Sequence, residues 1–252
     1  MTAIVITMHD HGFDICSDGA SYRPETLELA GLAHKVALLP VYSGFLTYRG
    51  VAAIMPIFEA ALDDRFTSFD EIVESADVLT HQAAQFVSTI RGQLPDFTIY
   101  IGGWSEDRER FELYAISATD RKTNEGGEAR KAFVVTPIEW CVIAPAAPRE
   151  ILASLGLVLD DGNFDLTPSA LPKFIHAARL SDIEEGGAIA GGFIQETTIR
   201  RNTSQTHVLY RYDDVQGDVM IPTPKETADV KRICDERAAA YAALRGQKLQ
   251  PA

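Results

Sequence analysis

The hydrophobic pattern at the start of the chain has the short period of β-strands. Residues 3–8 are rich in β-branched side chains, and residues 13–17 alternate apolar with polar on the other side of a His-Asp-His-Gly turn. This pattern is typical of a β-hairpin. Short strands are predicted again at 35–40 and 42–46, and residues 20–33 are predicted as a loop with some helix.

From residue 51 onward, the spacing between apolar residues lengthens to that of helices. Residues 51–62 form a compact apolar stretch, with Pro56 either in the first turns of a helix or at a kink. The next stretch, 68–92, is marked more strongly, because Ser68 and Glu71 match a capping box and the apolar residues after them recur at helical spacing. Two consecutive helices are therefore predicted.

The remaining chain repeats this alternation of strands and helices. Further strands are predicted at 97–103, 110–117, 131–137, 139–145, 193–199 and 206–212, and further helices at 150–155, from a Thr167-Pro168 cap onward, and at 223–246. The order of elements predicts an α+β fold, a four-layer αββα sandwich of two mostly antiparallel sheets between helical layers.

The length and the last helix suggest how the chain is divided. At 252 residues the chain lies near the upper size for one hydrophobic core. We expect residues 1–222 to form one domain. Residues 223–252 are expected to form a C-terminal amphipathic helix and a mobile tail, with an apolar face that runs from Val230 through Tyr241 to Leu244.

Charge and cysteine content narrow the class of protein. The net charge of -13 argues against nucleic acid as a partner, because phosphate binding needs clustered basic side chains. No run of about 18 apolar residues predicts a membrane segment, and no signal peptide is recognised. The three cysteines are widely spaced and form no CxxC pair, so a cytoplasmic location is expected.

Candidate chemistry is concentrated near the N-terminus. If Met1 is removed, Thr2 carries a free amine beside its hydroxyl, and such a threonine is a nucleophile with a built-in base. His9 and His11 form a His-x-His pair, but no third ligand accompanies them, so no metal site is predicted. Cys16 is interpreted as a thiol in the core.

The order of these residues resembles a known family. Residues 2–22 read as a threonine, an apolar strand, a turn, a second strand and an Asp-Gly step at Asp18, and Lys35 opens a later strand. This arrangement resembles the N-terminal nucleophile hydrolases, and within them the proteasome β-subunits and the bacterial proteasome-like peptidase that works with a ring ATPase. The resemblance in the order of elements extends over about residues 2–200.

The resemblance implies an activity and a set of roles. Thr2 would be the nucleophile of a threonine peptidase or amidohydrolase, Lys35 would supply positive charge, and Asp18 would orient Lys35. Backbone amides at Gly44 and Thr47 would bind the oxyanion. The substrate would be a peptide or amide, no cofactor is implied, and the chain would form a homo-oligomeric ring with an ATPase or another protein partner.

A second interpretation belongs to a different class. Bulky residues follow Gly44 where the family usually has small ones, and the helix from Thr223 has no recognised counterpart. A catalytically silent proteasome-like subunit, used for assembly or protein interaction in a cellular or viral particle, would also have these features. The native N-terminal residue distinguishes the two, because a retained Met1 would block the amine of Thr2.

Overall fold

The computed structural model describes most of the chain. The described residues are 2–23, 25–62, 65–121, 130–181, 188 and 190–248, with side chains described as far as residue 244. Met1 and residues 249–252, the last part of the predicted mobile tail, lie outside them.

One five-stranded antiparallel sheet contains the N-terminal hairpin. Its strands lie in the order β10-β1-β2-β11-β12. They are β1 (Ile4–His9), β2 (Gly12–Asp18), β10 (Cys141–Ala144), β11 (Phe193–Arg200) and β12 (Thr203–Arg211). The turn between β1 and β2 requires a glycine, because Gly12 has a φ of +141° and a Cβ there would lie 1.9 Å from the carbonyl oxygen of Ile199.

The second five-stranded sheet is also antiparallel and has the order β5-β6-β7-β8-β9. Its strands are β5 (Val36–Leu39), β6 (Gly44–Gly50), β7 (Phe97–Ser105), β8 (Arg110–Ser117) and β9 (Thr136–Ile138). A third, two-stranded sheet pairs β3 (Ala20–Tyr22) with β4 (Leu29–Leu32).

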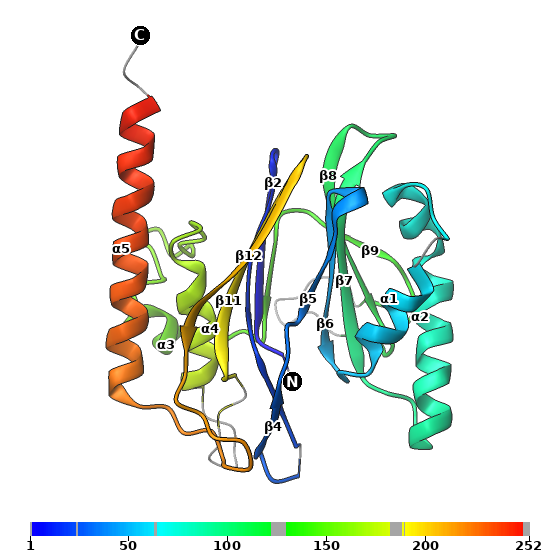
Figure 1. Ribbon diagram of the computed structural model, residues 1–252, viewed down its shortest axis with the longest axis horizontal. Helices are drawn as coiled ribbons and strands as arrows, with labels where there is room; N and C mark the ends of the chain where they lie inside the picture. The colour runs from blue at the N-terminus through cyan, green and yellow to red at the C-terminus, as the bar shows by residue number, and fades with distance from the viewer. Residues whose placement is uncertain are drawn as a thin grey trace.

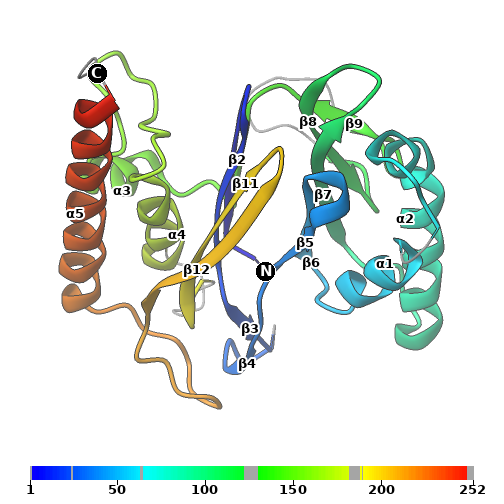
Figure 2. The ribbon, with the colours of Figure 1, turned by 45° about the horizontal axis from the view of Figure 1, so that its top comes forward.

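Helices cover the outer face of each large sheet (Figure 1). On one side lie α3 (Arg149–Ser154), α4 (Leu171–Leu180) and α5 (Pro224–Lys248), and on the other α1 (Ile54–Leu62) and α2 (Phe69–Arg91). Figure 2 shows the same order of layers from a second direction, with the two large sheets facing each other between the helices. The fold is therefore the expected α+β sandwich of four layers.

Three apolar cores hold the layers together. Ile6, Phe13 and Phe45 belong to the core between the two large sheets. A second core joins the β1 sheet to α3, α4 and α5, and a third joins the β6 sheet to α1 and α2. Because side chains alternate along a strand, β1 contributes to two cores, with Ile4 and Ile6 between the sheets and Val5 against the helices.

Some local expectations were wrong. Within residues 20–33, expected as a loop with some helix, Ala20–Tyr22 form β3 and Leu29–Leu32 form β4. The expected cap at Thr167 does not begin α4, because the Thr167 hydroxyl bonds to Asp165 and the helix begins at Leu171 with Pro172 in its first turn. Tertiary contacts outweighed these local signals.

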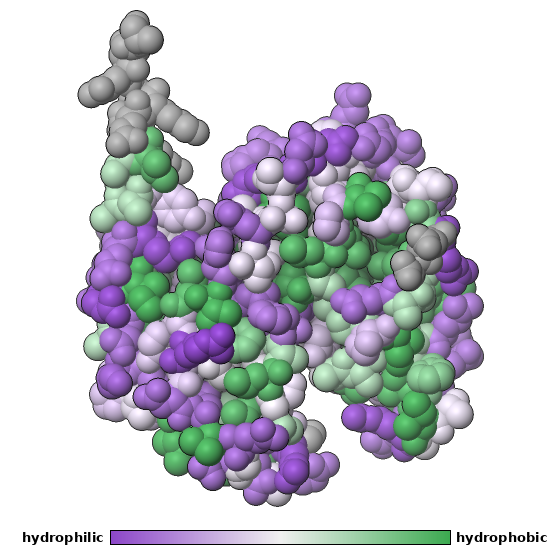
Figure 3. Space-filling view, in the orientation of Figure 1, coloured by the Kyte–Doolittle hydropathy of each residue, from purple (hydrophilic) through white to green (hydrophobic). Residues whose placement is uncertain are grey.

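The terminal helix is packed for only part of its length. Val230 and Cys234 are buried in the core beside α4, and Arg237 pairs with Glu196 of β11. Residues 238–244 are exposed, including Tyr241 and Leu244, which were expected on the apolar face. Figure 3 shows this end of α5 projecting from the body as a pale green, weakly hydrophobic surface.

Candidate active site

Thr2 lies just before β1, a strand of the first large sheet. Ile4 and Ile6 of β1 point into the core between the sheets, while Ala3 and Val5 face the helices. By the same alternation the Thr2 side chain belongs on the inter-sheet side. Only 1% of Thr2 is exposed.

Asp18 ends β2 beside Thr2 and is completely buried. Its Oδ1 accepts a hydrogen bond from the backbone N–H of Ala3 at 2.9 Å, while the Asp18 N–H donates to the Ala3 carbonyl at 3.0 Å. Its Oδ2 accepts from the N–H groups of Ala20 at 3.1 Å and Gly191 at 3.4 Å. The carboxylate is thus tied to the residue that follows Thr2.

Lys35 reaches the same carboxylate from the opposite sheet. It precedes β5, only 1% of it is exposed, and its Nζ lies 2.8 Å from Asp18 Oδ1. The ammonium also donates to the carbonyl of Ala20. Burying two charges is costly unless they pair closely and their remaining hydrogen-bonding groups are satisfied. The structure therefore brings Asp18 and Lys35 into direct contact, with Thr2 next to them through Ala3.

The two residues predicted as oxyanion donors lie apart on β6. The Thr47 hydroxyl donates to the Lys35 carbonyl at 2.6 Å, which fixes the backbone that carries the lysine. Gly44 lies three residues earlier, or about 10 Å along the strand. A Cβ at Gly44 would lie 2.5 Å from the carbonyl oxygen of Gly102, so close packing against β7 requires glycine there.

The backbone of Thr47 is paired on both sides, with Val36 of β5 and Tyr100 of β7. In such a position the N–H belongs to one of the two hydrogen-bond ladders. The structure thus links Thr47 to the site through its side chain, and the oxyanion role of Gly44 and Thr47 stays a prediction.

Two further residues belong to this site. The Ser17 hydroxyl is buried and has no hydrogen-bond partner among the described residues. It shares the inter-sheet face of β2 with Phe13 and Ile15, and the alternation in residues 13–17 could have placed it there. Gly191 holds Asp18 from the other side, and only the Gly-Gly step in the sequence marks that turn.

The charge of Asp18 affects neighbouring phenols. Burial and the negative charge of Asp18 raise the pKa of Tyr48 to about 12. Burial and Asp18 also raise the pKa of Tyr22 to about 12, against the opposing effect of Arg49. Both phenols are therefore neutral at physiological pH.

The predicted His-x-His pair lies at the other end of β1. The rings of His9 and His11 stack with their centroids 5.4 Å apart, and His9 Nε2 lies 3.3 Å from an oxygen of Asp14. Within the described ranges, no group of three or more His, Cys, Asp or Glu side chains could hold a metal ion.

Comparison with known proteins identifies the fold. A Gly-1 mutant of Anbu from Hyphomicrobium sp. strain MC1 matches with a TM-score of 0.57 and 12% identity over 100% of this chain and 99% of that one. Anbu, an ancestral beta-subunit, from Yersinia bercovieri matches with a TM-score of 0.57 and 11% identity over the same shares. This chain has the fold of Anbu.

The finding corrects the expected family. No protein-family model and no curated protein matches the sequence. These solved structures are of Anbu, and identities of 11–12% support the fold alone. Assigning the chain to the proteasome β-subunits or the ATPase-linked peptidase from its first residues was therefore wrong, because order of elements is shared more widely than family.

No helix in the described part of the chain is long and apolar enough to cross a membrane.

Proposed function

We propose that the chain is an N-terminal threonine hydrolase that cleaves peptide or amide bonds through Thr2 after removal of Met1. The observation that supports this proposal is the buried ion pair between Lys35 and Asp18, whose carboxylate is hydrogen-bonded to the residue next to Thr2. Burying the Lys35 and Asp18 charges costs free energy. A role for the pair in a reaction at the Thr2 hydroxyl would account for that cost.

In the proposed reaction the Thr2 oxygen attacks the substrate carbonyl and its proton passes to the α-amine of Thr2. The C–N bond breaks, the leaving amine takes that proton, and water then hydrolyses the ester on Thr2. The ammonium of Lys35 would stabilise negative charge on the attacking oxygen, and Asp18 would hold the lysine in place. Thr47 would position Lys35 through its hydrogen bond to the lysine carbonyl.

The test begins with the N-terminus. Intact mass spectrometry shows whether Met1 is lost, and an epoxyketone or β-lactone probe then reports a reactive N-terminal hydroxyl. We expect the Met1-free protein to gain one probe per chain. Thr2→Ser should still be labelled because serine keeps the hydroxyl beside the amine, whereas Thr2→Ala should not. Absence of labelling in Met1-free protein would contradict the proposal.

A second candidate function is a catalytically silent subunit that serves assembly or protein interaction. It is favoured by the exposed end of α5 at residues 238–244, a surface that a partner could cover. In either case we propose a homo-oligomeric ring, and an ATPase or other protein partner and a cytoplasmic location stay predictions. Met1 retained within a large native assembly would favour the silent subunit.

A further inference from the structure

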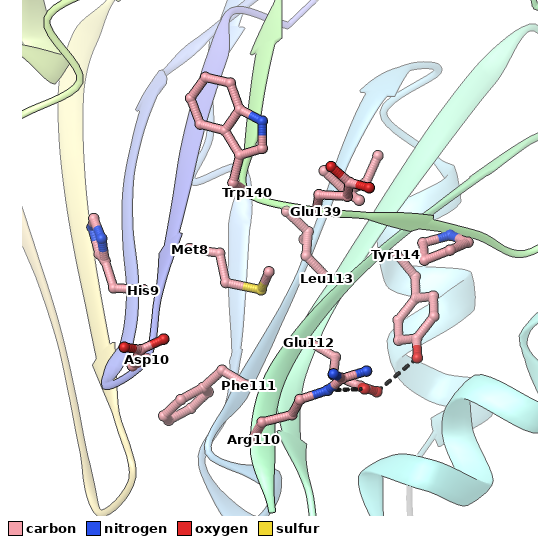
Figure 4. Close-up of a pocket in the computed structure, with 12 residues that line it drawn as sticks. Met8, His9, Asp10, Arg110, Phe111, Glu112, Leu113, Tyr114, Glu139 and Trp140 are labelled. Carbon is pink, nitrogen blue, oxygen red and sulfur yellow. Dashed lines mark hydrogen bonds and ion pairs between the residues drawn. The ribbon is translucent and has the colours of Figure 1, made fainter. Parts of the chain in front are cut away.

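An open pocket of about 530 Å³ lies at the opposite end of β1 from Thr2. Thr2 and His9 are seven residues apart, which is about 24 Å along a strand. The pocket is formed where β1 and β8 approach each other and the chain crosses from β9 to β10 through Glu139 and Trp140 (Figure 4). It is therefore separate from the candidate active site.

Short edge strands leave backbone unpaired in this pocket. Only Leu113, Tyr114 and Ala115 of β8 pair with β9, although β8 begins at Arg110. Among the described residues, 110–112 consequently have a sheet partner only on the β7 side. An unpaired strand edge is a template for an added strand. The pocket thus offers both a cavity and main-chain hydrogen-bonding groups.

The charges that line the pocket are unbalanced. Glu112 is satisfied, because it accepts hydrogen bonds from Arg110, Arg108 and Tyr114 at 2.7–2.8 Å. Asp10 and Glu139 are exposed, and neither has a hydrogen-bond or ion-pair partner in the described chain. Two free carboxylates therefore face a ligand in this pocket, and they favour a cation and disfavour a phosphate.

Apolar and aromatic groups complete the lining. Trp140 is 57% exposed, although it lies in a crossover between two sheets, and Met8 and Ile138 are half-buried beside it. Figure 4 shows Trp140 and Met8 on one side of the space and Glu139 and Leu113 on the other. An indole face binds a cation well, and a thioether accommodates an aliphatic stem.

We propose that this pocket binds an extended peptide segment of a partner protein, which adds as a strand to the free edge of β8 at residues 110–112. A basic side chain of the segment lies along Trp140, and the exposed carboxylates of Asp10 and Glu139 attract its charge. Main-chain bonds supply affinity, and the basic side chain supplies specificity. The site is independent of any reaction at Thr2.

The test is fluorescence anisotropy with a labelled, end-blocked heptapeptide of alternating threonine and valine that carries one central arginine. Matched peptides carry glutamine or glutamate instead. The full chain is used in a Thr2→Ala background so that no peptide is consumed. We expect the arginine peptide to bind about tenfold more tightly than the glutamine peptide, since two carboxylates attract it, and the glutamate peptide to bind more weakly than both.

Substitutions in the pocket test whether Asp10 and Glu139 bind the basic side chain. Asp10→Asn with Glu139→Gln should weaken arginine-peptide binding about tenfold, whereas Glu74→Gln, an exposed carboxylate on α2 outside the pocket, should change it less than twofold. Equal binding of the arginine and glutamine peptides, or unchanged binding by the double variant, would overturn the proposal. So would a double variant that loses self-association in sedimentation, since a second copy would then occupy the pocket.

Discussion

At the residue scale, the contact between Asp18 and Lys35 is a buried ion pair on which the stability of the candidate site depends. Both side chains are buried, and they come from different sheets. Removing one partner leaves the other charge unpaired in a medium that solvates it poorly. The pair therefore resists substitution even if the protein catalyses no reaction, and stability must be measured separately from activity.

We predict that Lys35→Met lowers the free energy of unfolding by about 3–5 kcal/mol, because it leaves the Asp18 carboxylate buried without its cation. Urea unfolding followed by circular dichroism measures this change. Arg23→Met is the matched control, since the Arg23 pair with Glu28 is solvent-exposed and should contribute less than about 1 kcal/mol. A Lys35→Met variant as stable as the control would show that Asp18 is satisfied without the lysine.

At the element scale, a second buried network attaches α5 to the rest of the fold. Arg179 of α4 lies 2.7 Å from Asp214 and 2.8 Å from Glu226 in the first turn of α5, and its guanidinium lies over the ring of Tyr212. Asp214 also accepts from the Gly192 N–H at 2.7 Å, next to the Gly191 that contacts Asp18. The start of α5 is therefore linked to the backbone of the candidate site.

This linkage predicts how truncation affects stability. A chain that ends at residue 222 lacks Glu226 and the buried residues of α5, so Arg179 keeps only one of its two carboxylate partners. The free energy of unfolding of this chain should be lower by more than about 3 kcal/mol. A chain that ends at residue 237 keeps these contacts and should stay within about 1 kcal/mol of the full chain. Equal stability of the two truncated chains would contradict this and would favour residues 1–222 as an independent domain.

The same helix contact predicts a dependence on pH. His176 of α4 hydrogen-bonds Thr227 of α5 at 2.9 Å, and burial lowers the pKa of His176 to about 4. Between pH 6.5 and about 4 the unfolded chain binds a proton that the folded chain does not. The free energy of unfolding is therefore not reduced by His176 above pH 6.5. As the pH falls to about 4, protonation of His176 in the unfolded chain lowers that free energy by up to roughly 3 kcal/mol.

Chemical denaturation at pH 7.5, 5.5 and 4.5 measures this dependence. His176→Gln can keep a hydrogen bond to Thr227 but cannot titrate, so its stability should fall less over the same interval than that of the native chain. Parallel pH profiles for the two proteins would assign the effect to other groups.

At the scale of the whole molecule, net charge opposes assembly. Each chain carries -13 at pH 7, so identical copies repel one another. Salt screens this repulsion, because the Debye length falls from about 30 Å at 0.01 M to about 10 Å at 0.1 M. Any ring must overcome this repulsion through apolar and close-range contacts.

We predict that self-association of the protein strengthens as salt rises from 0.01 M to 0.1 M at pH 7. Sedimentation velocity at fixed protein concentration measures the change, and Thr2→Ala should behave as the native chain because assembly does not use the hydroxyl. Dissociation on adding salt would instead indicate an interface held by opposite charges.

Features that depend on neighbours in sequence were predictable. The capping box at Ser68 and Glu71 begins α2 as expected, with the Ser68 hydroxyl accepting from the Glu71 N–H at 3.2 Å. The β1–β2 hairpin pairs Val5 with Cys16 in an unbroken register around its turn. The order of such elements was enough to predict the four layers, because amphipathic strands and helices can bury their apolar faces in few ways.

Features that depend on distant segments were decided by the tertiary structure. The sequence marked Asp18 and Lys35 as candidates, but only the packing of two sheets puts their charged atoms 2.8 Å apart. Alternation along β2 could place Ser17 between the sheets, but its lack of a hydrogen-bond partner among the described residues and the pocket beside Trp140 depend on neighbours distant in sequence. Local propensity acts over a few residues, whereas burial and ion pairing act through space, so the sequence by itself determined most of the elements, and the tertiary structure decided β3, β4 and the sites.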